Sequence, residues 1–256
     1  MVAERQRKAA QRSEELAAAD ERDGRVSWTL PEAGLVLAVM MASLLATDAI
    51  IGSSVMESVP AASRAVVRSA ILAVFYGIQL LTLGFLAARR NVGLRAAFGL
   101  QQRRVGLSAG LVTAGLVTLV LLVTRAVATS WGWAARAAGW TPPDVGDLMT
   151  VFGGGGAGFA LAAITVVVLG PLAEELAFRG VVLRAAGARW GQWPATVGTA
   201  ALFAAYHMTA WTAVPLFALG IALGWLAWTR RSLWAAILVH ALYNGTVVAA
   251  AYWLAA

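Results

Sequence analysis

Polar side chains that do chemistry gather in the last hundred residues of an otherwise apolar chain. Glu174, Glu175 and Arg179 interrupt one apolar run, and the only two histidines, His207 and His240, interrupt two later ones. A charged side chain at the centre of a bilayer costs at least a few kcal/mol, so its presence there indicates a function. Cysteine is absent from the sequence, which excludes a cysteine nucleophile, a disulfide framework and a thiolate metal site.

The two adjacent carboxylates are expected to differ in role. Glu175 and Arg179 are four residues apart and share a helix face, whereas Glu174 points about 100° away. Glu175 is therefore neutralised, while a carboxylate left without a cation in an apolar cavity becomes a better base. Glu174 is the candidate general base. For Glu175 and Arg179, a buried ion pair that fixes helix packing is as good an interpretation as a direct chemical role.

Each histidine has a partner at a spacing of four. Phe203 lies one turn before His207 and would brace its imidazole, and Asn244 lies one turn after His240 on the same face. A single buried histidine is more often a hydrogen-bonded core residue than a catalytic one. Two histidines and a carboxamide beside Glu174 instead predict an active site.

These groups suit the hydrolysis of an amide. Attack by water needs a base for its proton and donors aimed at the developing oxyanion, and the chain offers both. The alternative is a catalytic zinc site, because Glu174, His207 and His240 with one open position form a standard ligand set. Since the His-Glu-x-x-His spacing of many zinc proteases is absent, we favour a reaction without a cofactor and keep a divalent metal, zinc, as the alternative.

The remaining sequence must place these residues inside a membrane. Of the 256 residues, 60% are hydrophobic and 13% are charged, which predicts an all-α polytopic transmembrane bundle. The organisation expected is a charged cytoplasmic tail at 1–32, three membrane helices within 33–154, and a catalytic membrane domain at 155–256. Seven spans are predicted, at about 33–51, 67–88, 106–129, 155–183, 195–209, 212–229 and 232–254.

The distribution of arginine predicts the orientation of the chain. The net charge of +7 comes from short basic clusters between apolar runs, and clusters occur in every second connection. Such clusters mark cytoplasmic loops, so the amino terminus is expected on the cytoplasmic side. The membrane expected is the cytoplasmic membrane of a bacterium. The same pattern argues against a nucleic-acid partner. Asp48 and Arg125, near the outer ends of their spans, are given structural roles.

Depth in the membrane provides a check on the site. Glu174 is ten residues from Arg184 and His240 is nine from Arg231, which places both about 14 to 15 Å from the cytoplasmic surface. His207 is thirteen residues from Pro194, or roughly 20 Å by the same rise, and is therefore expected to lie deeper.

The three elements together resemble those of the CAAX prenyl protease and bacteriocin-processing family, which includes Abi-like proteins. The pattern is Glu-Glu-x-x-x-Arg, Phe-x-x-x-His and His-x-x-x-Asn, in that order. The resemblance covers roughly residues 155–250 and implies an intramembrane endopeptidase acting on a membrane-associated, possibly lipidated, protein or peptide. By the same resemblance, Glu174 and His207 activate water, His240 and Asn244 stabilise the oxyanion, and Glu175, Arg179 and Phe203 support them.

Two other functions remain open from the sequence. Buried Glu, Arg and His also form the ion relays of transporters, and Gly170-Pro171 resembles the helix breaks found in carriers. An inverted repeat with a second broken helix is not evident, which argues against a carrier. The second alternative is a non-catalytic immunity or binding protein that keeps the same pocket.

Overall fold

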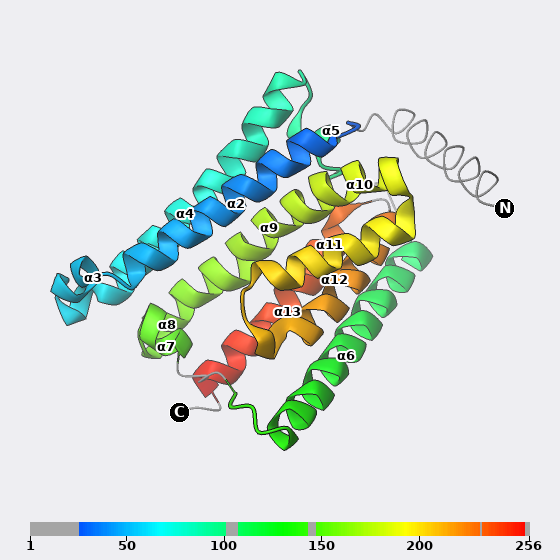
Figure 1. Ribbon diagram of the computed structural model, residues 1–256. Coiled ribbons are helices and arrows are strands. Elements are labelled where there is room, and N and C mark those ends of the chain that lie inside the picture. The colour runs from blue at the N-terminus through cyan, green and yellow to red at the C-terminus, as the bar shows by residue number, and fades with distance from the viewer. Residues whose placement is uncertain (1–25, 101–106, 143–146, 231, 254–256) are drawn as a thin grey trace.

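The protein is a bundle of helices in the computed structural model, which describes residues 26–100, 107–142, 147–230 and 232–253 (Figure 1). Every regular element in these ranges is helical, so the predicted all-α class is confirmed. In chain order the elements are α2 Leu30–Ile51, α3 Ser54–Ser58, α4 Ala61–Arg89, α5 Leu94–Ala97, α6 Leu107–Ala137, α7 Asp147–Phe152, α8 Gly155–Ala162, η1 Ala163–Leu169, α9 Gly170–Glu175, η2 Leu176–Val182, α10 Leu183–Trp190, α11 Gln192–Tyr206, α12 Ala210–Arg230 and α13 Leu233–Trp253.

Six helices in the described part of the chain are long and apolar enough to cross a membrane. They are Leu30–Ile51, Ala61–Arg89, Gly110–Ala137, Gly155–Trp190, Ala210–Arg230 and Leu233–Trp253. Each coincides with an expected span, and the protein is an integral, multi-pass membrane protein. The fifth expected span, 195–209, corresponds to α11, which has 15 residues. At 1.5 Å per residue it is about 22 Å long, shorter than a hydrocarbon core of about 30 Å.

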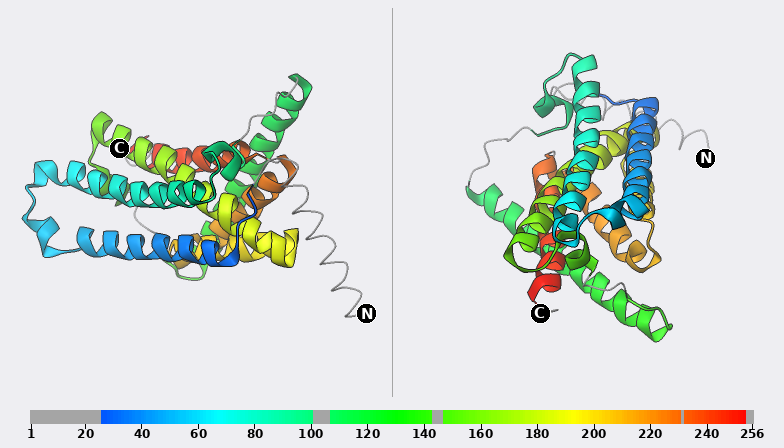
Figure 2. Two further views of the ribbon diagram at one scale, coloured as in Figure 1. Left: turned by 90° about the horizontal axis from the view of Figure 1, so that it is seen from above. Right: turned by 90° about the vertical axis from the view of Figure 1, so that its left-hand side faces the viewer.

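The helices form two groups around a central one. α2 and α4 lie side by side, joined at one end by α3, and the helix that contains α9 runs next to them (Figures 1 and 2). On its other side lie α11, α12 and α13, with α6 packed along α12 and α13. The residues of the predicted site belong to α9, η2, α11 and α13, in the middle of this arrangement.

Close packing of α11 against α12 depends on two glycines. A Cβ atom on Gly220 would lie 2.9 Å from both Cα and Cβ of Ala200, and one on Gly224 would lie 2.9 Å from the Thr196 methyl group. Lipid tails are as apolar as leucine, so membrane helices associate chiefly through such tight contacts. These two helices are thereby held at a fixed separation, which matters because His207 follows α11 directly.

The central helix is interrupted by two π-helical segments. η1 precedes α9 and η2 follows it, so the six residues of α9, which end in Glu174 and Glu175, lie between them. Such segments are rare and occur frequently at functional sites. Gly170 has helical backbone angles, and α9 continues through Pro171 without a break. The broken helix expected of a carrier is therefore absent at this position.

The start of the described chain packs onto the bundle. Trp28 is buried, stacks on Phe98 and donates from Nε1 to the carbonyl oxygen of Ala97 at 3.2 Å. Arg184 donates to the carbonyl oxygen of Val26 at 2.7 Å. The end of the predicted tail at 1–32 thus contacts other helices, while residues 1–25 of that tail lie outside the described residues.

Candidate active site

A buried ion pair forms the base of the site. Arg179 donates from Nη1 to Oε1 of Glu175 at 2.7 Å, and both side chains are almost wholly buried. The guanidinium also lies 4.5 Å from the Phe203 ring centroid and donates from Nη2 to the carbonyl oxygen of Gly220 at 3.2 Å. The predicted shared face of Glu175 and Arg179 is confirmed, and their pair joins the central helix to α11 and α12.

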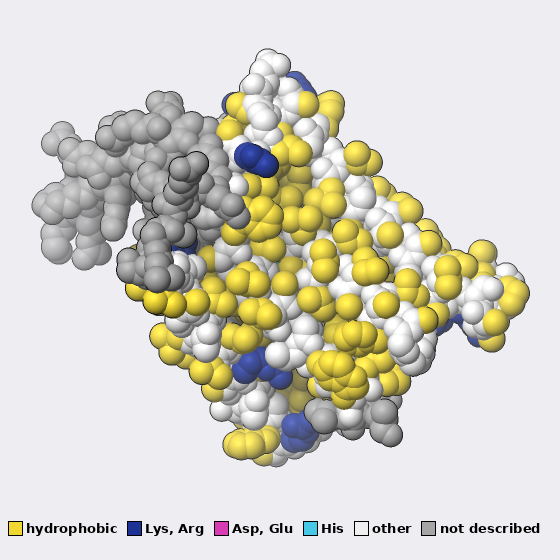
Figure 3. Space-filling view, turned by 180° about the vertical axis from the view of Figure 1, so that it is seen from behind, with side chains coloured by type: hydrophobic (Ala, Val, Ile, Leu, Met, Phe, Trp, Pro, Cys, Tyr) yellow, Lys and Arg dark blue, Asp and Glu magenta, His cyan; other side chains and the backbone are white. Residues whose placement is uncertain are grey.

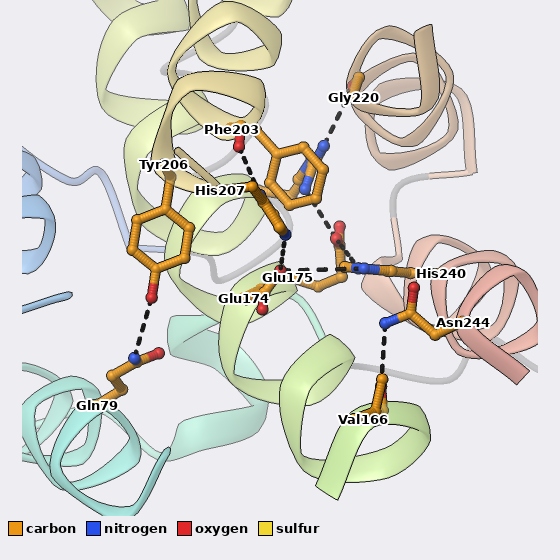
Figure 4. A network of polar contacts seen from close by, with 11 residues as sticks. Gln79, Val166, Glu174, Glu175, Phe203, Tyr206, His207, Gly220, His240 and Asn244 are labelled. Carbon is orange, nitrogen blue, oxygen red and sulfur yellow. Dashed lines mark hydrogen bonds and ion pairs between the residues drawn. The ribbon is translucent and has the colours of Figure 1, made fainter. Parts of the chain in front are cut away.

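His240 is held by the same carboxylate. Its Nδ1 lies 2.8 Å from Oε1 of Glu175, and the side chain is 1% exposed (Figure 4). An ionised carboxylate only accepts hydrogen bonds, so we assign the Nδ1 proton to this contact. The other nitrogen, Nε2, faces Oε2 of Glu174 at 3.9 Å. Glu175 therefore orients His240 towards its neighbouring carboxylate.

His207 approaches Glu174 from the opposite helix. Its Nδ1 lies 2.9 Å from the carbonyl oxygen of Phe203, which can only accept, so Nδ1 carries the proton and Nε2 offers a lone pair in the neutral ring. That Nε2 lies 3.8 Å from Oε2 of Glu174. The Phe203 ring packs edge-on against the imidazole at 4.9 Å between centroids, so it braces His207 as expected. His207 is 28% exposed and thus connects the site to its surroundings.

Glu174 has a buried Oε2 without a hydrogen-bond partner, and so has Glu175, but only that of Glu174 faces both histidines. This oxygen is buried, and the two imidazole Nε2 atoms lie 3.8 and 3.9 Å from it. Both distances exceed a hydrogen bond of about 2.7 to 3.2 Å, and a small molecule that bridges these atoms would satisfy all three. An unpaired buried carboxylate oxygen is costly, which favours a bound water or substrate group at this point.

The prediction that His207 lies deeper than Glu174 is wrong. The depth of Glu174 was counted from Arg184 and that of His207 from Pro194, but the helix of Glu174 continues through α10 to Trp190, and α11 begins at Gln192. Counted from that turn, Glu174 is 16 residues from Trp190 and His207 is 15 residues from Gln192. The two residues therefore lie at the same level.

Asn244 is turned towards the central helix. Its Nδ2 donates to the carbonyl oxygen of Val166 in η1 at 2.9 Å, and this contact uses one of its two N–H bonds (Figure 4). His240 and Asn244 project from α13 towards the central helix, as their spacing predicts. His240 contacts α9, and Asn244, one turn further along α13, contacts η1.

Three residues around the site were not predicted from the sequence: Gln79, Tyr206 and Gly220. Gln79 of α4 donates from Nε2 to the Tyr206 hydroxyl at 3.4 Å, and its buried Oε1 has no partner. The Tyr206 ring lies 5.6 Å from the His207 ring. Gln79 could have been found from the sequence, because it is a lone carboxamide within the apolar run 67–88. Gly220, which acts through its backbone, gave none.

The donor atoms also fit a metal ion chemically. Each histidine directs Nε2 towards Glu174 while an oxygen acceptor fixes its Nδ1, which is the usual arrangement around metal-bound imidazole. In the part of the chain that the structure describes, no cluster of three or more His, Cys, Asp or Glu side chains is drawn together as a metal site. Glu174, His207 and His240 would be the ligands.

The comparison with known families points to one group. Residues 156–246 match the family described as Rce1-like, type II CAAX prenyl endopeptidase Rce1-like. This segment contains the Glu-Glu-x-x-x-Arg, Phe-x-x-x-His and His-x-x-x-Asn elements in full. No similar curated protein and no similar solved structure is found for the chain.

Proposed function

We propose that this protein hydrolyses a peptide bond of a membrane-associated or lipidated protein or peptide, because residues 156–246 match the family described as Rce1-like, type II CAAX prenyl endopeptidase. The observation that supports this most directly is the unpaired, buried Oε2 of Glu174 with an imidazole Nε2 on each side. A bacterial cytoplasmic membrane is the proposed location, on the distribution of arginine between the spans.

In the proposed reaction, Glu174 and His207 act on a water molecule. The water donates hydrogen bonds to Oε2 of Glu174 and Nε2 of His207, which are both acceptors and 3.8 Å apart. Its oxygen attacks the substrate carbonyl carbon while Glu174 takes the proton. A positioned base of this kind accelerates a reaction by about 10²- to 10⁴-fold.

His240 and Asn244 are the proposed donors to the oxyanion. Because Nδ1–H of His240 is held by Glu175, donation from Nε2 to the oxyanion requires the imidazolium form of this ring. The second N–H bond of Asn244 is the other donor. When the tetrahedral intermediate collapses, the C–N bond breaks, and Glu174 returns its proton to the leaving amine.

Zinc is the alternative for the same three side chains. A zinc ion bound by Glu174, His207 and His240 would supply a Lewis acid for the carbonyl oxygen. We propose the metal-free reaction, since Asn244 and an imidazolium already provide donors. Activity that survives dialysis against 1,10-phenanthroline is the expected result. Activity that is lost and then restored by zinc would establish the metal-dependent reaction instead.

Replacing the proposed base tests the function directly. Purified Glu174→Gln protein in liposomes should cleave a lipidated peptide at least about 10²-fold more slowly than the wild type, since the carboxamide cannot take the proton. The matched control is Glu57→Gln, the same change in α3, far along the chain from the site. Turnover by Glu174→Gln equal to that of the control would remove Glu174 from the reaction.

The runner-up function is proton-coupled transport. Its support is the same unpaired carboxylate, because a buried Glu beside two imidazoles also suits a proton relay. Substrate-driven proton flux into liposomes without peptide cleavage would favour transport. Peptide cleavage without flux is the result expected here.

A further inference from the structure

Two arginines away from the proposed active site line a cavity between α6, α12 and α13. The cavity has a volume of about 580 Å³, and its lining includes Arg125 and Arg136 of α6. Each guanidinium lies over an aromatic ring, Arg125 at 5.1 Å from the Tyr243 centroid and Arg136 at 5.4 Å from the Trp211 centroid. Cation–π contacts orient these guanidinium groups but leave their charge uncompensated.

No carboxylate of the described residues neutralises these arginines. Between described residues, ion pairs join Arg90 to Glu32 at 2.6 Å and Arg179 to Glu175 at 2.7 Å, and neither involves this cavity. The described residues that line the cavity include no Asp or Glu. Figure 3 shows arginine side chains on an otherwise hydrophobic face, where no acidic side chain is visible among the described residues. The cleft between α2 and α4 differs, since Glu32 and Arg90 both line it.

The two arginines reach the cavity from one face of α6. They are 11 residues apart, which is three helical turns and about 16 Å, so they lie on the same face of α6. Arg136 donates from Nη1 to the carbonyl oxygen of Gly132, one turn back, and its side chain therefore points along the helix towards Arg125. This bend shortens the distance between the two charges.

Both arginines belong to a helix that is long and apolar enough to span the membrane. A cation in such a helix requires a counter-charge or water. Guanidinium groups bind phosphate oxygens in a bidentate way, and the apolar cavity wall, which includes Pro215 and Val247, suits hydrocarbon. We propose that this cavity binds the phosphate of an anionic phospholipid between Arg125 and Arg136, with the acyl chains along the exposed apolar side chains of α6.

Lipid binding by the purified full-length protein tests this. The protein is exchanged into zwitterionic detergent, short-chain phosphatidylglycerol is titrated in, and bound lipid is counted by native mass spectrometry. The Arg125→Gln, Arg136→Gln double variant should bind at least about tenfold more weakly than the wild type. Arg89→Gln is the matched control, because Arg89 also lies over an aromatic ring, that of Phe85, but outside this cavity. Glu174→Gln should bind phosphatidylglycerol like the wild type, which separates this site from the proposed active site.

Three results would overturn the proposal. These are equal binding of phosphatidylglycerol by the double variant and the control, equal binding of phosphatidylcholine and phosphatidylglycerol by the wild type, and displacement of the lipid by inorganic phosphate at the same concentration. If the double variant does not fold, the single Arg136→Gln variant tests lipid binding instead. Arg136 is exposed near the end of α6, so its replacement should leave the fold intact. This variant should bind phosphatidylglycerol more weakly than Arg89→Gln does.

Discussion

The first three spans and the last three use their polar residues differently. The most apolar windows of α2, α4 and α6 are 17%, 28% and 17% buried, whereas those of the central helix, α12 and α13 are 33%, 39% and 39% buried. In the first group, Ser43 donates to the carbonyl oxygen of Met40 one turn away, and Glu32 pairs with exposed Arg90. In the second group, the buried carboxylate of Glu175 contacts both Arg179 of its own helix and His240 of α13.

The two halves differ in whether polar side chains are removed from water. Glu32 and Arg90 lie at the surface, where a pair contributes little and is readily replaced by water. Glu175 and Arg179 have no such replacement, and Glu174 beside them has an oxygen with no partner. The second half of the chain therefore combines the tightest packing with the least satisfied polar groups, which is typical of a functional site.

The largest effect on stability is expected from breaking the buried pair. Arg179→Met leaves the Glu175 charge buried without its cation and should lower the free energy of unfolding by about 3 to 5 kcal/mol. Arg90→Met, the same change in the exposed pair, should lower it by about 0 to 1 kcal/mol. Denaturation of both variants in detergent measures the difference. Equal losses would mean that the two halves of the molecule do not differ as described.

The next effect concerns two carboxamides, one in each half: Gln79, which is buried, and Asn244, which is partly buried. Asn244→Ala should reduce kcat by about 10²- to 10³-fold with a small change in KM, because a donor to the oxyanion acts in the transition state. Gln79→Ala, in α4, should reduce kcat less than about tenfold. Steady-state kinetics on a lipidated peptide separates them. A larger loss for Gln79→Ala would move the oxyanion site towards α4.

The smallest effect comes from two helix glycines. Gly220→Ala should destabilise the protein by about 1 to 3 kcal/mol, because the new methyl group meets Ala200 at 2.9 Å. Gly84→Ala in α4 should be neutral or slightly stabilising, since nothing lies within 4 Å of its Cβ position. Melting temperatures of the two variants test this. Equal shifts would show that α11 and α12 can separate without cost.

Much of the site was predictable because it follows helical spacing. The four-residue spacing fixed which side chains share a face, and the contacts of Glu175 with Arg179 and of Phe203 with His207 agree with it. The convergence of Glu174, His207 and His240 was a hypothesis from their types and depths. The 3.8 and 3.9 Å distances support that hypothesis, while the roles of these residues remain proposals.

The features that could not be predicted depend on tertiary structure. The level of His207 relative to Glu174 was misjudged because the depth of Glu174 was counted from Arg184, a charged residue within a helix that continues to Trp190. Arg184 can stay within that helix because backbone carbonyls of Ala97 and Val26 satisfy its guanidinium. Such partners come from distant segments, and one sequence does not reveal them.

The two π-helical segments have a consequence for how this helix tolerates changes in length. A π turn holds one more residue than an α turn, so each segment absorbs the equivalent of a one-residue insertion. A residue added or deleted between Gly170 and Glu174 would rotate Glu174, Glu175 and Arg179 together by about 100° relative to η1. Substitutions along the exposed side of this helix should therefore be accepted more readily than insertions or deletions, because it is angular register that brings the carboxylates to face α13.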